Sequence, residues 1–255
     1  MDTEEGVLVT LSAVEVSRYA RQILIPGWGQ GTQRELRART VFVAEAGGLG
    51  SPVSIYLAAA GVGHLRIADF DTVDQTNLNR QILHDETRIG VNKADSARMT
   101  LERVNPYIRV TALPVRIDPL NVDELVDDAD IIVDCMDNFA TRYLLNDSAI
   151  RKGIPLVYGS IWGLHGQISF FHVPETACLR CLVPGEPPRE IFPVLGVTPA
   201  VVGSWQALEA LKYLTGVGRN LKGRLLFWEG DDMEIQTLPI RPDPQCRACA
   251  WLRQQ

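Results

Sequence analysis

Residues 40–50, TVFVAEAGGLG, join an apolar run to a glycine-rich turn, and a helical pattern follows over residues 52–60. The β-branched and aromatic residues at 40–44 are typical of a buried strand. Gly47, Gly48 and Gly50 carry no side chain, so backbone N–H groups there can approach a phosphate at the start of the helix. Strand, glycine turn and helix in this order favour a nucleotide-binding unit, although helix–strand packing alone can also require glycine.

Strands and helices alternate beyond this turn, which predicts a Rossmann-like α/β fold with a doubly wound, mostly parallel sheet. Strand-like runs cover residues 40–44, 65–69, 110–114, 131–134 and 156–159, and helical patterns cover 52–60, 93–104 and 140–151.

Segments outside this alternating core differ in character. Two helical patterns at 14–22 and 32–39 are too short for a domain and predict an arm that packs on the core or on another subunit. Residues 166–172 and 224–239 are strand-rich, 200–214 are helical, and the proline-rich residues 183–199 predict a crossover loop. We expect one domain over residues 1–255, with a helical arm at 1–39, a nucleotide-binding core at 40–160 and a strand-rich C-terminal part at 161–255.

Composition and charge narrow the classes of function. The 255 residues are 46% hydrophobic and carry a net charge of −6, as in a soluble globular protein with a sizeable core. Without a basic run, the chain has no electrostatic footprint for nucleic acid or an anionic membrane surface. The acidic amino terminus leads into no apolar signal core and no apolar stretch is long enough to span a bilayer, so we expect a cytoplasmic protein.

Charged residues near the ends of the expected strands help to identify the nucleotide. Asp69 follows the second strand at the distance where an acid holds ribose hydroxyls, which leaves NAD and ATP both open. Arg80, Lys93 and Asp137 add two cations and a carboxylate that hydride transfer does not need. Such groups suit attack at a phosphate, because fixed cations and a metal ion stabilise the charge that develops there. The residues therefore predict a site for ATP and magnesium, against the alternative that each charge is a solvated surface group.

Four of the five cysteines form two Cys-x-x-Cys pairs, Cys178/Cys181 and Cys246/Cys249. Four thiolates at this spacing match a closed, tetrahedral structural zinc site. A redox pair is the competing interpretation, and it is disfavoured because neither pair is expected to open a helix after a strand. Cys135 follows an apolar strand and is interpreted as a small core residue, and the four histidines show no ligand spacing.

Several motifs in one order resemble those of the ThiF/MoeB/HesA family, the prokaryotic relatives of ubiquitin-activating enzymes. The resemblance covers nearly the whole chain, from about residue 17 to residue 249. Besides GGLG at 47–50 and the two cysteine pairs, it rests on RYARQ at 18–22, DFD at 69–71, TNLNRQ at 76–81, Lys93 and DCMDN at 134–138.

The resemblance implies ATP-dependent adenylation of the C-terminal glycine of a small ubiquitin-like sulfur carrier that ends in Gly-Gly, with release of pyrophosphate. It also implies that residues 161–255 bind the carrier and the zinc ion, that Asp69 holds the ribose and that Asp137 binds magnesium. Arg21 would reach across a homodimer interface into the partner's ATP site. The implied catalytic residues are Arg21, Arg80, Lys93 and Asp137, and the implied nucleotide-binding residues are Gly47, Gly48, Gly50, Asp69, Asp71, Asn77, Arg80, Gln81, Lys93 and Asp137.

Two positions depart from the family pattern. The family's turn usually begins with glycine two residues before Gly47, where this chain has Glu45. That carboxylate either repels the triphosphate and crowds the turn or points away at little cost, and the sequence leaves both open. Relatives that form a thioester place a cysteine four residues before the glycine matching Gly196, where this chain has Phe192. Phenylalanine is no nucleophile, and no sulfur-transfer domain precedes the last residue, Gln255. We therefore expect the reaction to stop at the acyl-adenylate, with sulfur donated by a separate protein.

Two other functions are compatible with parts of the sequence. A family member whose nucleotide site has decayed through Glu45 would bind the carrier without catalysis. An NAD-dependent oxidoreductase would use the glycine turn and Asp69, but it would have no use for Arg80, Lys93 and Asp137.

Overall fold

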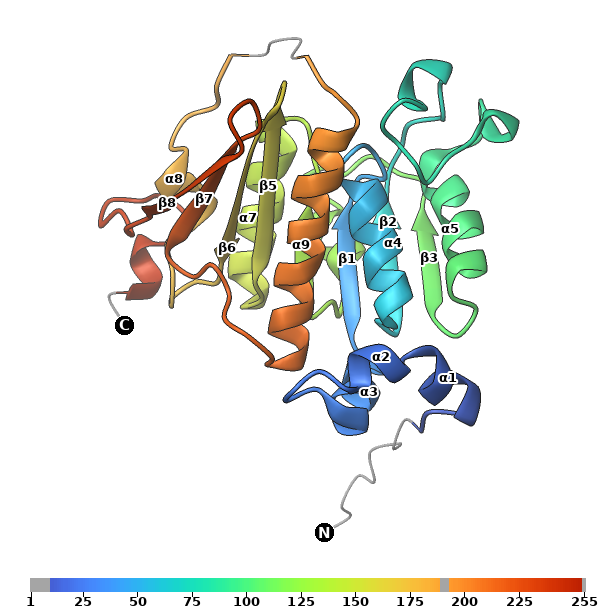
Figure 1. Cartoon of the computed structure of the whole chain (residues 1–255). Coiled ribbons are helices and arrows are strands. Elements are labelled where there is room, and N and C mark those ends of the chain that lie inside the picture. Colours follow the sequence, from blue (N-terminus) through green and yellow to red (C-terminus); the bar gives the residue numbers. More distant parts are fainter. Residues whose placement is uncertain (1–9, 189–192, 254–255) are drawn as a thin grey trace.

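An eight-stranded sheet forms the centre of the molecule, with the strand order β3-β2-β1-β4-β5-β6-β7-β8 (Figure 1). The structure, a computed structural model, describes residues 10–188 and 193–253. The strands are β1 (Thr40–Ala44), β2 (His64–Ala68), β3 (Arg109–Leu113), β4 (Ile131–Asp134), β5 (Leu156–Trp162), β6 (His165–Phe171), β7 (Arg224–Glu229) and β8 (Glu234–Pro239).

The first five strands are parallel and the last three pair antiparallel, which confirms the predicted mostly parallel α/β sheet. The order β3-β2-β1-β4-β5 places β1 and β4 side by side at the centre, where the winding direction reverses. Ligands in doubly wound folds bind at the carboxyl ends of strands at such a reversal. The predicted run at 156–159 proves longer, because β5 continues to Trp162 and turns directly into β6.

Helices cover both faces of the sheet, as a doubly wound fold requires. On one face α4 (Gly50–Ala60), α5 (Lys93–Val104) and α9 (Val197–Thr215) pack side by side, and α7 (Phe139–Lys152) covers the other face (Figure 1). The short helix α6 (Val122–Val126) packs beside α7 in the same core. The side chains of β1 divide between the two faces: Val41 and Val43 join the core under α4, whereas Phe42 joins the core under α7. This alternation follows from the two-residue period of a strand.

The N-terminal arm packs on its own core, at the end of the sheet opposite the carboxyl ends of the parallel strands (Figure 1). The predicted helix at 14–22 is divided at Tyr19 into α1 (Ala13–Arg18) and α2 (Ala20–Ile23), and α3 (Gly29–Arg37) follows. The Tyr19 ring is 1% exposed, lies against Gly61, and its hydroxyl accepts a hydrogen bond from Asn105 at 2.8 Å. Burial of this ring therefore fixes the arm on the body.

The C-terminal part completes the sheet and carries the cysteines. The strand-rich stretch at 224–239 is a hairpin of β7 and β8, and the predicted helix at 200–214 lies within α9. Cys178 caps the short helix α8 (Leu179–Leu182), which contains Cys181, and Cys246 and Cys249 lie just before the 3₁₀ turn η3 (Ala250–Arg253). Phe192 lies outside the described residues. None of the described helices is both long and apolar enough to cross a membrane.

Candidate active site

The turn between β1 and α4 has the tight geometry that the glycine pattern predicts. Glu45 adopts a positive φ of 81°, a conformation that side chains other than glycine rarely take. Gly50, the first residue of α4, lies so close to the Glu45 carbonyl oxygen that a Cβ atom there would be 1.9 Å from it. Position 50 therefore requires glycine, and the first N–H groups of α4 face the carboxyl edge of the sheet.

Asp69 fastens this turn to β2. One of its carboxylate oxygens accepts from the Ala46 N–H and the other from the Asp71 N–H, both at 2.9 Å, and its residue is 4% exposed. Asp69 thus holds the turn in place. Its contact with a ribose stays a prediction. Lys93 begins α5 and is 5% exposed, with Nζ 3.2 Å from an Asp71 carboxylate oxygen. This lysine therefore places a buried positive charge beside the turn.

Residues 75–88 form a strap over the carboxyl edge. The strap begins with the 3₁₀ turn η1 (Gln75–Asn77) and ends with the 3₁₀ turn η2 (Glu86–Arg88). The aliphatic stem of Arg80 lies in van der Waals contact range of Gly48, and the side-chain amide of Gln81 lies near Gly47. The Arg80 guanidinium is held by the Thr76 carbonyl and the Asn79 amide oxygen, each at 2.9 Å. The structure thus brings these predicted residues to the glycine turn.

Asp137 lies just after β4, in the loop before α7, and its carboxylate is exposed. Among the described residues it accepts one hydrogen bond, from the Asn138 amide at 3.3 Å. A free carboxylate at the carboxyl edge fits a magnesium ion, which binds proteins through one or two carboxylates together with substrate phosphates.

A buried ion pair holds the loop that contains Asp137. Arg142 on α7 donates to the Gly159 carbonyl at 2.8 Å and to the Met136 carbonyl, and it lies 3.6 Å from Asp134. Asp134 in turn accepts from the Met136 N–H at 3.0 Å. Both backbone polar groups of Met136, the neighbour of Asp137, are therefore held by charged side chains that are shielded from water.

Glu45 does not point away from the site. Its Oε1 atom would be 2.8 Å from a Cβ atom on Gly47, so the side chain folds over the turn, and its Oε2 atom is buried with no hydrogen-bond partner among the described residues. Burial, reinforced by the carboxylates of Asp137 and Asp69, raises the pKa of Glu45 well above its usual value. The side chain therefore crowds the turn, and its carboxyl group ionises less readily than an exposed one.

Arg21 lies apart from the other predicted residues. It is exposed on α2, and the adjacent Gln22 donates to the Ala60 carbonyl at the far end of α4 from the glycine turn. The eleven residues of α4 span about 16 Å. The arm of this chain therefore holds Arg21 away from the chain's own turn.

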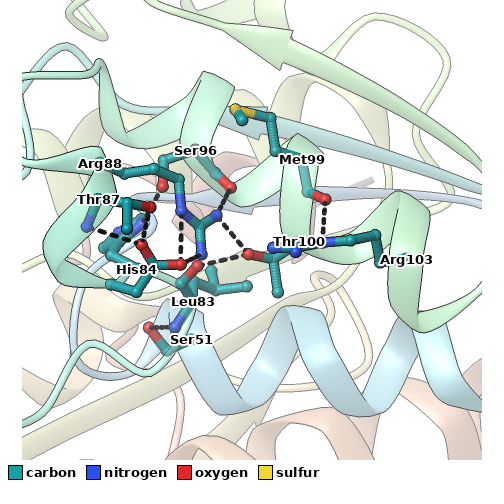
Figure 2. A network of polar contacts seen from close by, with 10 residues as sticks. Ser51, Leu83, His84, Thr87, Arg88, Ser96, Met99, Thr100 and Arg103 are labelled. Atoms are coloured by element: carbon teal, nitrogen blue, oxygen red, sulfur yellow. Dashed lines mark hydrogen bonds and ion pairs between the residues drawn. The ribbon is translucent and has the colours of Figure 1, made fainter.

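A buried polar network that no motif in the sequence indicates holds the strap (Figure 2). His84 contacts the Ala46 carbonyl through Nε2 at 3.0 Å and the Ser96 hydroxyl through Nδ1 at 2.8 Å. Arg88 donates to the Ser96 carbonyl at 2.7 Å and to the Thr100 hydroxyl. These partners lie 8 to 38 positions away in the sequence, so no local spacing reveals them.

The four paired cysteines form one cluster near the carboxyl terminus. Their sulfur atoms all lie within 4.8 Å of one another, with Cys178–Cys181, Cys178–Cys246 and Cys181–Cys249 separations of 3.9, 3.6 and 3.5 Å. Tetrahedral zinc with bonds of about 2.3 Å places its sulfur ligands about 3.8 Å apart, so the cluster fits that ion. The distances are far too long for disulfides.

Neighbouring donors favour thiolates in this cluster. The Asp243 N–H donates to Cys181 Sγ at 3.4 Å and Arg253 to Cys249 Sγ at 3.1 Å. Burial raises the pKa of Cys178, so a cation is needed to hold its thiolate at neutral pH. Cys178 does cap a helix, α8, after β6, so the expectation that neither cysteine pair opens a helix after a strand is wrong. The meeting of all four sulfurs is the stronger reason to favour a metal. Cys135 is a buried core residue, as predicted.

Comparison with known proteins agrees with this architecture. A model of the ThiF family matches residues 19–248. The chain belongs to the ThiF family. It is 43% identical to the sulfur carrier protein adenylyltransferase of Thermus thermophilus over 92% of this chain and 91% of that protein. It is also 43% identical to the SAMP-activating enzyme E1 of Haloferax volcanii over 94% of this chain and 91% of that protein.

The probable adenylyltransferase/sulfurtransferase MoeZ of Mycobacterium tuberculosis is 44% identical over 92% of this chain but 62% of its own length. These identities to named adenylyltransferases make the chain a ThiF-family adenylyltransferase of the ubiquitin-activating type. The oxidoreductase alternative finds no support among them.

Solved structures share the fold. Escherichia coli MccB with AMPCPP and MccA superposes with a TM-score of 0.82 at 23% identity, over 91% of this chain and 74% of that chain. MccB with ATP superposes with a TM-score of 0.83 at 23% identity, over 93% of this chain and 75% of that chain. At this identity the likeness concerns the fold alone.

We predict that this ThiF-family chain binds one zinc ion through Cys178, Cys181, Cys246 and Cys249. The ion would join α8 to the last turn of the chain, so a chelator should lower the melting temperature. Cys246→Ser should bind less than one zinc per chain and lose most of the chelator effect, whereas Cys135→Ser should keep full zinc content. Elemental analysis of protein purified without chelator that finds no zinc would contradict the prediction.

Proposed function

We propose that the chain uses ATP and magnesium to adenylate the C-terminal glycine of a small ubiquitin-like sulfur carrier and releases pyrophosphate. The observation that carries the proposal is that Arg80 lies beside Gly48, while Lys93 and Asp137 lie close enough for their charges to act on Glu45 of the same turn. The chain is also 43% identical to a sulfur carrier protein adenylyltransferase. A carrier tail ending in Gly-Gly suits a narrow approach to this edge, because glycine has no side chain to obstruct it.

The reaction places two groups of like charge against each other. A carboxylate oxygen of the carrier forms a bond to the α-phosphorus of ATP, and the bond from that phosphorus to the bridging oxygen of pyrophosphate breaks. Arg80 and Lys93 would neutralise the phosphates, and the first N–H groups of α4 would contribute further donors. Asp137 would hold magnesium, which neutralises the polyphosphate and the charge on the leaving group. Asp69 would keep the turn in place and accept from the ribose.

The distribution of cysteines supports a reaction that stops at the acyl-adenylate. Cys135 is 4% exposed in the core, and the other four cysteines belong to the metal-type cluster. Burial raises the pKa of the Cys135 thiol well above its usual value. None of the five thiols is therefore suited to attack an adenylate at the sheet edge. We propose that a separate protein donates the sulfur. The domain assignment proposed is one adenylation domain, with residues 161–255 forming its carrier-binding and zinc part.

A homodimer is part of the proposal, because Arg21 is exposed and remote from its own turn. In a two-fold symmetric dimer both copies contribute the same surface, so the arm of each protomer can reach the site of its partner. We place the protein in the cytoplasm, where reduced cysteines bind zinc.

We predict ATP–pyrophosphate exchange that depends on both magnesium and a genome-encoded carrier ending in Gly-Gly. Asp137→Asn should reduce exchange by about a hundredfold or more, because the carboxylate that would hold magnesium is lost. Asp128→Asn, an exposed change at the opposite end of β4, is the matched control. If the parent binds the carrier but catalyses no exchange, the chain is a carrier-binding protein without catalysis.

Arg21 should act from the partner protomer. Arg21→Ala and Asp137→Asn chains should each be inactive alone, and mixing them should restore part of the exchange activity. The reason is that one of the two sites in a mixed dimer keeps both residues. Purified heterodimers without any recovered activity would show that Arg21 does not act in trans.

Glu45→Gly should bind ATP more tightly than the parent, by about tenfold or 1.4 kcal/mol. Glycine adopts the positive φ of this position without strain and removes the side chain that covers Gly47. Glu45→Gln keeps the side chain that covers Gly47 and should gain much less. Calorimetric titration with ATP and magnesium chloride checks this, with the exposed Glu102→Gln as control. Equal affinity in Glu45→Gly and the parent would contradict crowding of the turn by this side chain.

A further inference from the structure

His84 lies where three parts of the site meet. It belongs to the strap that carries Arg80, its Nε2 faces the Ala46 carbonyl of the glycine turn, and its Nδ1 faces Ser96 on α5, the helix that begins with Lys93. The ring is 7% exposed and its two contacts measure 3.0 and 2.8 Å. One imidazole therefore joins the turn, the strap and the lysine helix.

The hydrogen-bond chemistry fixes the tautomer. A carbonyl oxygen can only accept, so Nε2 carries the proton and donates it to Ala46. Nδ1 then has a lone pair, and the Ser96 hydroxyl donates to it. Burial is the main cause that lowers the pKa of His84 to about 4, opposed by the Ala46 carbonyl and Asp85 and assisted by Lys93 and Arg88. The ring is therefore neutral at physiological pH.

Hydrogen bonds also hold the neighbours of His84 in the strap. The Leu83 carbonyl accepts from the Thr100 hydroxyl at 2.6 Å, and its N–H donates to the Ser51 hydroxyl of α4 at 3.4 Å (Figure 2). Arg88 joins the end of the strap to Asp85 within the strap and to α5. The strap is thus tied to α4 and α5 on both sides of the imidazole.

We propose that His84 is a positioning residue that holds the phosphate-binding turn, Arg80 and Lys93 at fixed separations. The inference rests on the proposed function, because it concerns how the same site binds ATP. His84 touches no nucleotide itself. It acts through the carbonyl of Ala46. The N–H of Ala46 donates to Asp69, so both backbone polar groups of this residue are held.

The consequence concerns the phosphates specifically. Without the imidazole, the Ala46 carbonyl loses its partner in a water-poor site, and the turn can shift relative to the strap. Binding energy would then be spent on restoring the arrangement, which weakens binding of ATP and of inorganic pyrophosphate. In the proposed function the body of the carrier binds to residues 161–255, so its affinity should change little.

The test compares His84→Phe, His84→Gln and Ser96→Ala with the parent. Phe fills the space without hydrogen bonds, and Gln places an N–H donor near the position of Nε2 and should restore the contact with Ala46. The control is His64→Gln, since His64 bonds Thr111 at 2.8 Å near the amino end of β2, far from the turn. Calorimetry measures the affinity for ATP with magnesium chloride and for inorganic pyrophosphate, and exchange kinetics separate the KM for ATP from that for the carrier.

His84→Phe should weaken ATP and pyrophosphate binding and raise the KM for ATP by about tenfold, with the KM for the carrier unchanged. Ser96→Ala should show a smaller loss, and His84→Gln and His64→Gln should stay near the parent. If His84→Phe does not fold, Ser96→Ala carries the test. Parent-like ATP affinity in His84→Phe and Ser96→Ala, even with lowered melting temperatures, would reduce His84 to a structural role. A parent that binds no ATP would overturn the proposed function together with this inference.

Discussion

The close approach of Gly50 to the Glu45 carbonyl is the constraint on which the site depends. A Cβ atom at position 50 would lie 1.9 Å from that oxygen, so α4 can begin this near β1 because the residue is glycine. The approach turns the first N–H groups of α4 toward the carboxyl edge, where β1 and β4 meet at the reversal of the sheet. Strand order then brings two further predicted residues to the same edge, because Asp69 follows β2 and Asp137 follows β4.

Buried polar side chains hold this edge in place. Arg142 and Asp134 bond the backbone of Met136, next to Asp137, and His84 bonds the backbone of Ala46, next to Gly47. Burying such groups is costly unless their hydrogen bonds are made, so they fix one arrangement of the loops more than they stabilise the fold. A site that must receive a triphosphate needs such fixed positions, because loops that rearrange on binding lose affinity.

The sequence predicted most of the fold and the residues of the carboxyl edge, because both follow from strand periodicity and strand ends. It did not predict the break at Tyr19, which depends on packing against Gly61, or the short helix α6. The roles of His84 and Arg88 depend on partners in distant segments, and a single sequence does not reveal such pairs. The sequence also left the direction of the Glu45 side chain open, because that direction depends on the positive φ of this residue.

Intact mass spectrometry of the carrier tests the central claim most directly. The carrier would be incubated with this chain, ATP and magnesium chloride, with pyrophosphatase present, and the reaction quenched in acid. The account predicts a carrier that gains the mass of one AMP group, on its C-terminal glycine, and that forms a hydroxamate with hydroxylamine. A carrier that binds the chain in the presence of bound ATP and still keeps its original mass would contradict the account.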